Sequence, residues 1–120
     1  MLTGQVPVLK CQSVERTLEF YKDTLGFIEI KTRKPEKQLE WAYLNSGKAF
    51  LMLELDETLP KNHTDTIRLY FFTDNIESFH QYVKAKQYSV SDLETTKYRL
   101  KQCLLIDPDG RKIQIGETLS

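Results

Sequence analysis

The sequence lacks an excess of charge of either sign. Its 120 residues include 17 Lys and Arg and 17 Asp and Glu side chains, so the formal charges cancel. Binding to nucleic acid depends on clustered Lys and Arg and normally leaves a domain basic, so this balance argues against a nucleic-acid partner. An RNA-binding β-α-β domain would also need an aromatic, glycine-containing strand together with a basic face, and the sequence shows neither.

Long apolar runs, a signal peptide and paired cysteine motifs are also missing. The longest apolar runs have about the length of strands, well below the roughly 18 to 20 residues that cross a bilayer. The two cysteines, Cys11 and Cys103, form no CxxC pair and no metal-binding spacing with histidine. We therefore expect a cytoplasmic protein with no membrane partner, whose thiols are reduced and partly buried.

Familiar catalytic motifs are absent as well. The sequence contains no Gly-rich phosphate loop, and no Ser/His/Asp or Cys/His arrangement can be assembled from it. Its two histidines are His63, in a polar stretch, and His80, on a predicted helix, and we interpret both as surface residues. The charged stretch 92–101, DLETTKYRLK, is interpreted as a solvated edge and not as a binding patch.

What is present predicts a strand, a helix and three further strands in the first half of the chain. Residues 5–11 alternate as a strand does. A helix follows, with Ser13 as its N-cap and Gly26 at its end. Its buried face is predicted from the apolar positions Val14, Leu18, Tyr21 and Leu25. Three more strands are predicted at 27–33, 39–45 and 49–55.

The same order is predicted to repeat in the second half. Residues 66–73 form a strand, and Asp74 caps a second helix in a capping box with Glu77. The buried face of this helix is predicted to hold Ile76, Phe79 and Val83. The remaining strands are predicted near 88–90 and at 98–106 and 111–117. The two strand–helix segments keep one offset along the chain, which indicates a duplication; a chance match between two common local patterns is the alternative.

These elements predict an α+β fold of two tandem βαβββ modules. The modules cover about 1–57 and 65–120, are bridged by 58–64, and together form a single domain over residues 1–120. Because a helix covers one face of each sheet, the other face is free to curve. We therefore predict a curled mixed sheet around a concave cavity.

The segment 103–117, CLLIDPDGRKIQIGE, predicts a hairpin whose second strand carries an amide toward that cavity. Pro108 and Gly110 suit a tight turn between two apolar strands. Ile113 and Ile115 then share the packed face of the returning strand, which places Gln114 on the other face. A solvated surface amide is the alternative interpretation of Gln114.

Matched positions on the first and last strands of both modules share the face without a helix. These positions are Val6, Val8, Lys10, Phe50, Met52 and Glu54 in the first module and Arg68, Tyr70, Phe72, Lys112, Gln114 and Gly116 in the second. Trp41 and Tyr43 add aromatic side chains on one face of a further strand. Aromatic walls with few polar groups suit a flat organic ligand, and ordinary core filling is the alternative for each single ring.

Three segments resemble the vicinal oxygen chelate superfamily, which includes glyoxalase I, extradiol dioxygenases, and bleomycin- and fosfomycin-resistance proteins. They are VPVLKCQSVERTLEFYKDTLGF near the start, YFFTDNIESF in the middle and LLIDPDGRKIQI near the end. The resemblance covers nearly the whole chain. It implies a glyoxalase/bleomycin-resistance-like fold of paired βαβββ modules around one concave site, commonly in a homodimer.

The resemblance also implies where a metal ion would bind, and this chain departs from the pattern there. In metal-using members, histidine and carboxylate side chains from four strands hold a divalent ion, and those positions fall here on Val6, Glu54, Arg68 and Gln114. Only Glu54 is a competent ligand, because valine has no lone pair, arginine is a cation and glutamine offers a neutral oxygen. The chain therefore resembles the metal-free branch, with no cofactor expected.

We predict a small-molecule-binding protein that takes an aromatic organic ligand without a metal. The predicted ligand-binding residues are Val6, Val8, Trp41, Phe50, Met52, Glu54, Arg68, Tyr70, Phe72 and Gln114. The absence of a negative net charge argues against cationic bleomycin as the specific ligand.

Two alternatives stay open at this stage. If Glu54 and Arg68 meet, they form an ion pair that either holds the two halves together or grips the ligand. The chain could instead be a lyase or dioxygenase-like enzyme, either with a shifted set of metal ligands or with Glu54 as a base and Arg68 stabilising an oxyanion.

Overall fold

A computed structural model describes residues 1–60 and 67–119. Contacts between residues divide the chain into two compact units, Met1–His63 and Thr64–Ser120. The division falls within the predicted bridge at 58–64, of which 61–64 lie outside the described residues. That the two units form a single domain stays a prediction, and each unit is described by itself.

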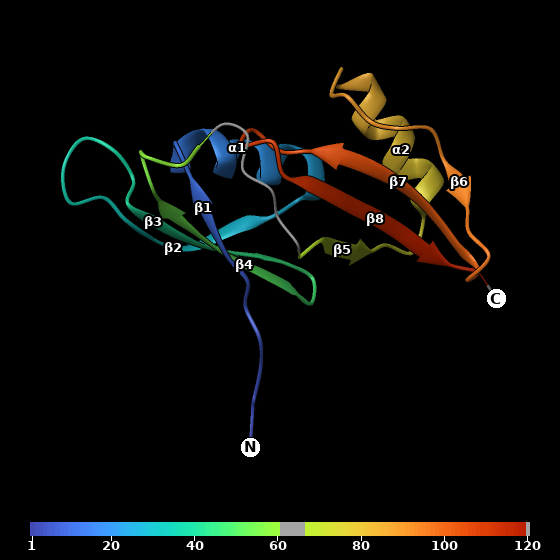
Figure 1. The fold of residues 1–120 in the computed structure, drawn as a ribbon, viewed down its shortest axis with the longest axis horizontal. Coiled ribbons are helices and arrows are strands. Elements are labelled where there is room, and N and C mark those ends of the chain that lie inside the picture. Colours follow the sequence, from blue (N-terminus) through green and yellow to red (C-terminus); the bar gives the residue numbers. More distant parts are fainter. Residues whose placement is uncertain (61–66, 120) are drawn as a thin grey trace. The chain divides into compact units, whose positions relative to one another are not determined.

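The first unit has the predicted order of one strand, one helix and three strands (Figure 1). Its elements are β1 (Val8–Cys11), α1 (Val14–Leu25), β2 (Ile28–Arg33), β3 (Trp41–Ser46) and β4 (Ala49–Leu55). They form a four-stranded sheet in the order β1-β4-β3-β2, in which β1 pairs with β4 in parallel and the other pairs are antiparallel. The prediction of one helix over a mixed sheet is confirmed for this unit.

The helix α1 begins and ends where its sequence predicts. Ser13 Oγ accepts a hydrogen bond from the Arg16 N–H at 3.2 Å, which satisfies one of the free donors of the first turn. Gly26 has a φ of 70°, a left-handed conformation that costs glycine little, and its N–H bonds to the Lys22 carbonyl. The helix packs its buried side against β3 and β4.

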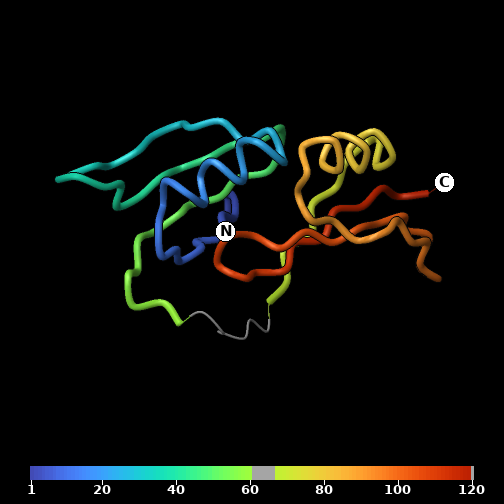
Figure 2. The backbone as a smooth tube through the Cα atoms, turned by 90° about the horizontal axis from the view of Figure 1, so that it is seen from above, coloured from blue at the N-terminus to red at the C-terminus, as the bar shows by residue number. Residues whose placement is uncertain are grey.

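The second unit repeats this topology. Its elements are β5 (Leu69–Phe72), α2 (Ile76–Ala85), β6 (Glu94–Thr95), β7 (Leu100–Ile106) and β8 (Lys112–Thr118). The sheet order is β5-β8-β7-β6, with β5 parallel to β8 and the other pairs antiparallel. Figure 2 shows α2 running alongside the strands of this unit, and it packs against β7 and β8. The two βαβββ modules are therefore present, as predicted.

Two local predictions in the second unit are wrong. The N-cap of α2 is Asn75 and not Asp74, because the Asn75 side chain accepts the Ser78 N–H at 3.0 Å. Glu77 therefore closes no capping box with Asp74. Its carboxylate instead binds the Lys101 side chain, whose hydrogen bond and charge lower the pKa of Glu77.

The predicted strand near 88–90 is reduced to one isolated bridge between Val90 and Leu105. Next to it, the Ser91 hydroxyl accepts the Leu104 N–H at 2.7 Å, in place of a backbone carbonyl. A side chain that takes a backbone partner interrupts the ladder. Regular pairing resumes at Glu94, opposite Gln102, so the strand lies later in the chain than predicted.

The hairpin that joins β7 to β8 has the predicted turn. Gly110 adopts a φ of 84°, and the Asp107 N–H bonds to the Arg111 carbonyl at 2.9 Å. Ile113 and Ile115 are fully buried while Gln114 lies on the other face, so the alternation predicted for this strand is confirmed. No helix within residues 1–60 and 67–119 is long and apolar enough to cross a membrane.

Candidate functional site

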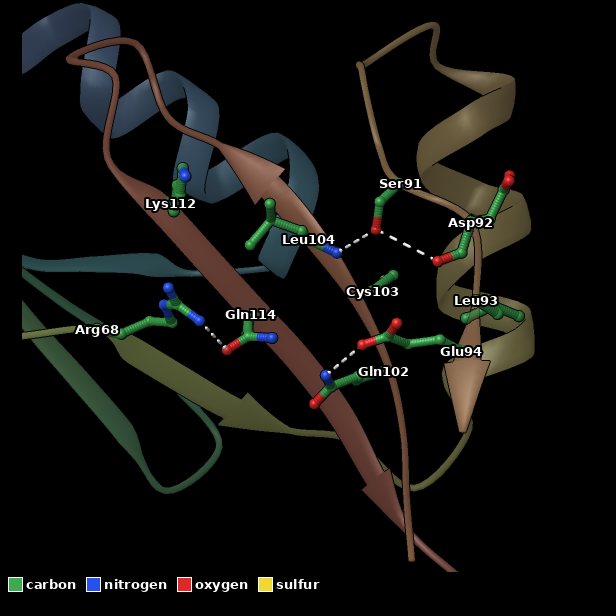
Figure 3. A pocket seen from close by; sticks show the side chains of 10 residues that line it. All are labelled: Arg68, Ser91, Asp92, Leu93, Glu94, Gln102, Cys103, Leu104, Lys112 and Gln114. Carbon is green, nitrogen blue, oxygen red and sulfur yellow. Dashed lines mark hydrogen bonds between the residues drawn. The ribbon is translucent and has the colours of Figure 1, made fainter. Parts of the chain in front are cut away.

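The face of the second sheet that is turned away from α2 collects several predicted site residues. We call it the open face of the second sheet. Strand pairing places Tyr70 beside Gln114 and Phe72 beside Gly116. The next strand along adds Leu104 opposite Gln114 and Gln102 opposite Gly116. Arg68 precedes β5 and reaches toward the same face (Figure 3).

A pocket of about 430 Å³ lies along β7, β8 and the segment that leads into β6. Its walls come entirely from the second unit (Figure 3). The residues that line it are Arg68, Ser91, Asp92, Leu93, Glu94, Gln102, Cys103, Leu104, Lys112 and Gln114. Two predicted ligand-binding residues, Arg68 and Gln114, are therefore in the lining.

Arg68 and Gln114 are in direct contact. Arg68 Nη1 donates to Gln114 Oε1 at 3.1 Å. A guanidinium has only donors, so this contact fixes which end of the amide faces the arginine. The Gln114 carbonyl is thus engaged, and its NH₂ group has no partner among the described residues. A donor is therefore available for a ligand at this point.

Tyr70, Gln102 and Glu94 form a hydrogen-bonded chain across the sheet. The Tyr70 hydroxyl donates to Gln102 Oε1 at 2.9 Å, and Gln102 Nε2 donates to Glu94 Oε1 at 2.8 Å. Burial raises the pKa of the Tyr70 phenol, which favours its protonated, donating form. The buried Gln102 amide is satisfied at both ends, so it holds the Glu94 carboxylate at the pocket in a fixed direction.

Ser91 shapes the opposite wall of the pocket. Its N–H bonds to the Leu104 carbonyl at 3.0 Å while its hydroxyl accepts the Leu104 N–H. Its own carbonyl contacts His80 Nε2 at 2.9 Å, which ties the wall to α2. These bonds hold the start of the segment that carries Asp92 and Glu94.

Cys103 lines the pocket but is a poor nucleophile. Its side chain is 2% exposed, and burial raises the pKa of the thiol from 9.0 to about 11. The thiolate, which is the reactive form, is therefore scarce at neutral pH. Neither Cys11 nor Cys103 forms a disulfide, and both are buried.

The predicted site residues of the first unit lie mainly on the face of its sheet turned away from α1. Val8 pairs with Met52, and the rings of Trp41, Tyr43 and Phe50 form a row with centroids 6.2 and 6.0 Å apart. Glu54 is exposed on β4, and Val6 precedes β1 and is half-buried. The meeting of these residues with the second unit stays a prediction, as does an ion pair between Glu54 and Arg68.

The side chains at the four positions that the resemblance implies as metal ligands do not fit a metal ion. Val6 has no donor atom, and the carbonyl oxygen of Gln114 is bound to a permanent cation, Arg68. Glu54 alone cannot supply the three or more protein ligands that such sites normally use. Within residues 1–60 and 67–119, no group of three or more His, Cys, Asp or Glu side chains is placed to hold a metal.

Several pocket residues were not predicted as site residues. Lys112 was predicted on the face without a helix but not as a ligand-binding residue. The others are Ser91, Asp92, Leu93, Glu94, Gln102, Cys103 and Leu104. The first three residues of the stretch 92–101, which was interpreted as a solvated edge, line this pocket, and Asp92 and Glu94 are exposed there. Extending the hairpin register from the turn would have placed Gln102 and Leu104 beside Gly116 and Gln114.

Solved structures with the same fold include two antibiotic-binding proteins and a lyase. A bleomycin-binding protein solved with bleomycin is 18% identical, with a TM-score of 0.77 over 98% of this chain and 99% of that chain. TnmS3, an antibiotic-binding protein from a Streptomyces species, is 21% identical, with a TM-score of 0.72 over 98% of each chain. Lactoylglutathione lyase from Agrobacterium tumefaciens is 16% identical, with a TM-score of 0.74 over 96% of this chain and 92% of that chain.

These likenesses confirm the predicted fold. No curated protein sequence matches the chain. The sequence model of one family, described as the Glyoxalase/Bleomycin resistance protein/Dioxygenase superfamily, matches residues 7–115. This match spans most of the chain and includes both βαβββ modules. The chain therefore belongs to the Glyoxalase/Bleomycin resistance protein/Dioxygenase superfamily.

Proposed function

We propose that this protein binds a small aromatic organic molecule without a metal ion, and that the pocket of the second unit is part of the binding site. The contact between Arg68 and Gln114 carries the proposal. At two of the positions that the family resemblance implies as metal ligands, this chain has a cation bound to an amide. An amide with a free NH₂ group suits an organic acceptor better than it suits a metal.

The aromatic side chains of the open face support a flat ligand. The rings of Tyr70 and Phe72 lie 5.0 Å apart, and Phe72 is 66% exposed. A large exposed ring next to a polar pocket is typical of ligand sites, where aromatic walls supply contact area and a few polar groups fix orientation. Two structural neighbours are a bleomycin-binding protein and an antibiotic-binding protein, which supports the same class of function.

We also propose that the protein is a cytoplasmic homodimer whose cavity is shared by two chains, as the family resemblance implies. The two buried cysteines form no disulfide, which is compatible with a reducing compartment. Bleomycin itself is not proposed as the ligand, because the formal net charge of the chain is zero.

A thermal-shift screen against aromatic metabolites and antibiotics, with chelator present, tests the proposal. A ligand raises the melting temperature because it binds only the folded protein. Gln114→Leu should remove most of the shift, while Gln81→Leu on the exposed side of α2 should keep it. Isothermal titration then gives the affinity of each hit for both variants.

Metal titration tests whether the protein binds its ligand without a metal ion. The purified protein is incubated with Zn, Ni, Mn or Fe, and bound metal is measured after desalting. We expect no stoichiometric uptake. Tight uptake of one ion per chain would contradict the proposal and favour the alternative, a lyase or dioxygenase-like enzyme with an atypical ligand set.

A further inference from the structure

The pocket of the second unit has opposite charges on its two sides. Arg68 and Lys112 lie on one side, next to β5 and at the start of β8. Asp92 and Glu94 lie on the other side, on the segment that leads into β6 (Figure 3). At neutral pH the pocket therefore has two positive and two negative side chains and no net charge.

These charges do not neutralise one another within the protein. No ion pair in the described part of the chain includes Arg68, Lys112, Asp92 or Glu94. All four side chains are exposed at the pocket. The two charged sides are thus available to groups of a bound molecule.

Two neighbouring glutamines each bind one of the opposite charges. Arg68 is held by Gln114 on β8, and Glu94 is held by Gln102 on β7. Gln114 lies directly opposite Leu104, so Gln102 is its diagonal neighbour, and such pairs are separated by about 7–8 Å. Leu104, which lies opposite Gln114 and two residues from Gln102 on β7, adds an apolar side chain to the lining.

We propose that the ligand of this pocket is dipolar, with an acidic group at one end, a protonated nitrogen at the other and an apolar middle. The acidic group binds Arg68 and Gln114, the nitrogen binds Glu94, and the middle lies over Leu104. This inference rests on the proposed function and specifies the class of ligand. An α-amino acid, whose two charges are attached to one carbon, does not span both anchors.

Four probes that share a benzene ring test the proposal by isothermal titration. They are para-(aminoethyl)benzoic acid, with charges at opposite ends; para-ethylbenzoic acid, with only the acid; phenethylamine, with only the amine; and phenylalanine, with both charges at one end. We expect the first to bind at least roughly tenfold more tightly than the others, because it alone makes two charge-assisted contacts.

Charge variants assign each end of the probe. Glu94→Gln keeps a side chain that can form a hydrogen bond with Gln102. It should lower the affinity for the dipolar probe and for phenethylamine, without changing the affinity for para-ethylbenzoic acid. Arg68→Gln should lower the affinity for the dipolar probe and for para-ethylbenzoic acid, without changing the affinity for phenethylamine. Glu19→Gln on the exposed side of α1 serves as a control and should change none of the affinities.

The outcomes separate this inference from the proposed function. If all four probes bind with equal affinity and none binds the Gln114→Leu variant, the ligand is not dipolar. That result would still support an aromatic binding site. Retention of the dipolar preference in both charge variants would also overturn it. If neither the probes nor any aromatic compound of the screen binds the folded protein, both proposals fail.

Discussion

Gly116 is the residue on which the arrangement of the open face depends most directly. A Cβ atom at this position would overlap the hydroxyl and ring of Tyr70, which crosses Gly116 on its way to Gln102. Gly116 has an ordinary strand conformation, so glycine is required here because it has no side chain and not because of its backbone freedom. Only glycine leaves room for the tyrosine that orients Gln102.

Gly116→Ala should lower the free energy of unfolding by about 1–3 kcal/mol, because it forces Tyr70 out of place. Chemical denaturation of the purified variant measures the loss. In a Tyr70→Leu background, the same alanine should cost less than about 0.5 kcal/mol, since nothing then crosses the strand. Equal costs in both backgrounds would show that Tyr70 is not the group that excludes a side chain.

Cys103 makes stability depend on pH in the alkaline range. Burial raises the pKa of its thiol from 9.0 to about 11. The unfolded thiol therefore ionises first as pH rises, so the unfolded state binds fewer protons than the folded state between these values. The stabilising contribution is complete below about pH 9 and is lost as pH rises through about 11.

The free energy of unfolding should thus fall more steeply between these pH values in the natural protein than in Cys103→Ala. Urea denaturation at a series of pH values checks this. Ile115→Val, which trims the directly opposite residue but removes no titrating group, should keep the natural slope. If Cys103→Ala shows the same slope as Ile115→Val, another group must account for the alkaline loss.

At this scale, the sequence predicted the residues whose direction follows from strand alternation. Period two places Gln114 on the face of β8 away from the buried Ile113 and Ile115, and it places Arg68 on the same face as Tyr70 and Phe72. Glu94 could not be identified in this way. Its place at the pocket depends on the interrupted pairing at Ser91, which is a tertiary effect of one hydroxyl on the neighbouring strand.

Among the elements, the β7–β8 hairpin depends on a buried ion pair at its turn. Arg111 Nη1 donates to Asp107 Oδ2 at 2.7 Å, and both side chains are buried. Asp107 Oδ1 also accepts the N–H groups of Asp109 and Arg111. One carboxylate therefore fixes both the turn and the register of the two strands that bear Gln102 and Gln114.

Asp107→Asn should lower the free energy of unfolding by about 3 kcal/mol, because it removes the negative charge that Asp107 places beside the buried Arg111 cation. Thermal and urea denaturation measure the effect. Asp56→Asn is the matched control, since Asp56 also accepts two bonds within a turn, from Thr58, but in a more exposed place. A loss no larger than that of the control would contradict a structural role for the ion pair.

The elements themselves were largely predictable, and their exceptions have local causes. Ser13 and Gly26 bound α1 as expected, because capping and left-handed geometry are properties of single residues. The cap of α2 was misplaced by one position because Asp74 and Asn75 are both good caps, and Glu117 decides between them. Its carboxylate accepts the Ile76 N–H at 2.9 Å, from a strand far along the chain.

For the whole molecule, the repeated strand–helix pattern was sufficient to predict two βαβββ modules, and the family was predicted from the resemblance of three segments. Each module packs its apolar residues against its own helix. The spacing of these residues within one short stretch of sequence is therefore enough to predict its helices and strands. The pocket differs, because ten residues from four separate stretches of chain form it. The assembly of the open faces into one shared cavity follows from the family resemblance and stays a prediction.

A homodimer is the last expectation at this scale. Large apolar side chains are exposed on the open faces, with Phe72 at 66% and Val8 at 51%, and such surfaces commonly mark association sites. Sedimentation equilibrium should give twice the 14.1 kDa mass of one chain, and the melting temperature should rise with protein concentration. Phe72→Ser should weaken association, while Tyr98→Ser, equally exposed but in the loop before β7, should not. A single-chain mass with a melting temperature independent of concentration would contradict the dimer. The exposed aromatic residues of the open face of the second sheet would then serve only to bind the ligand.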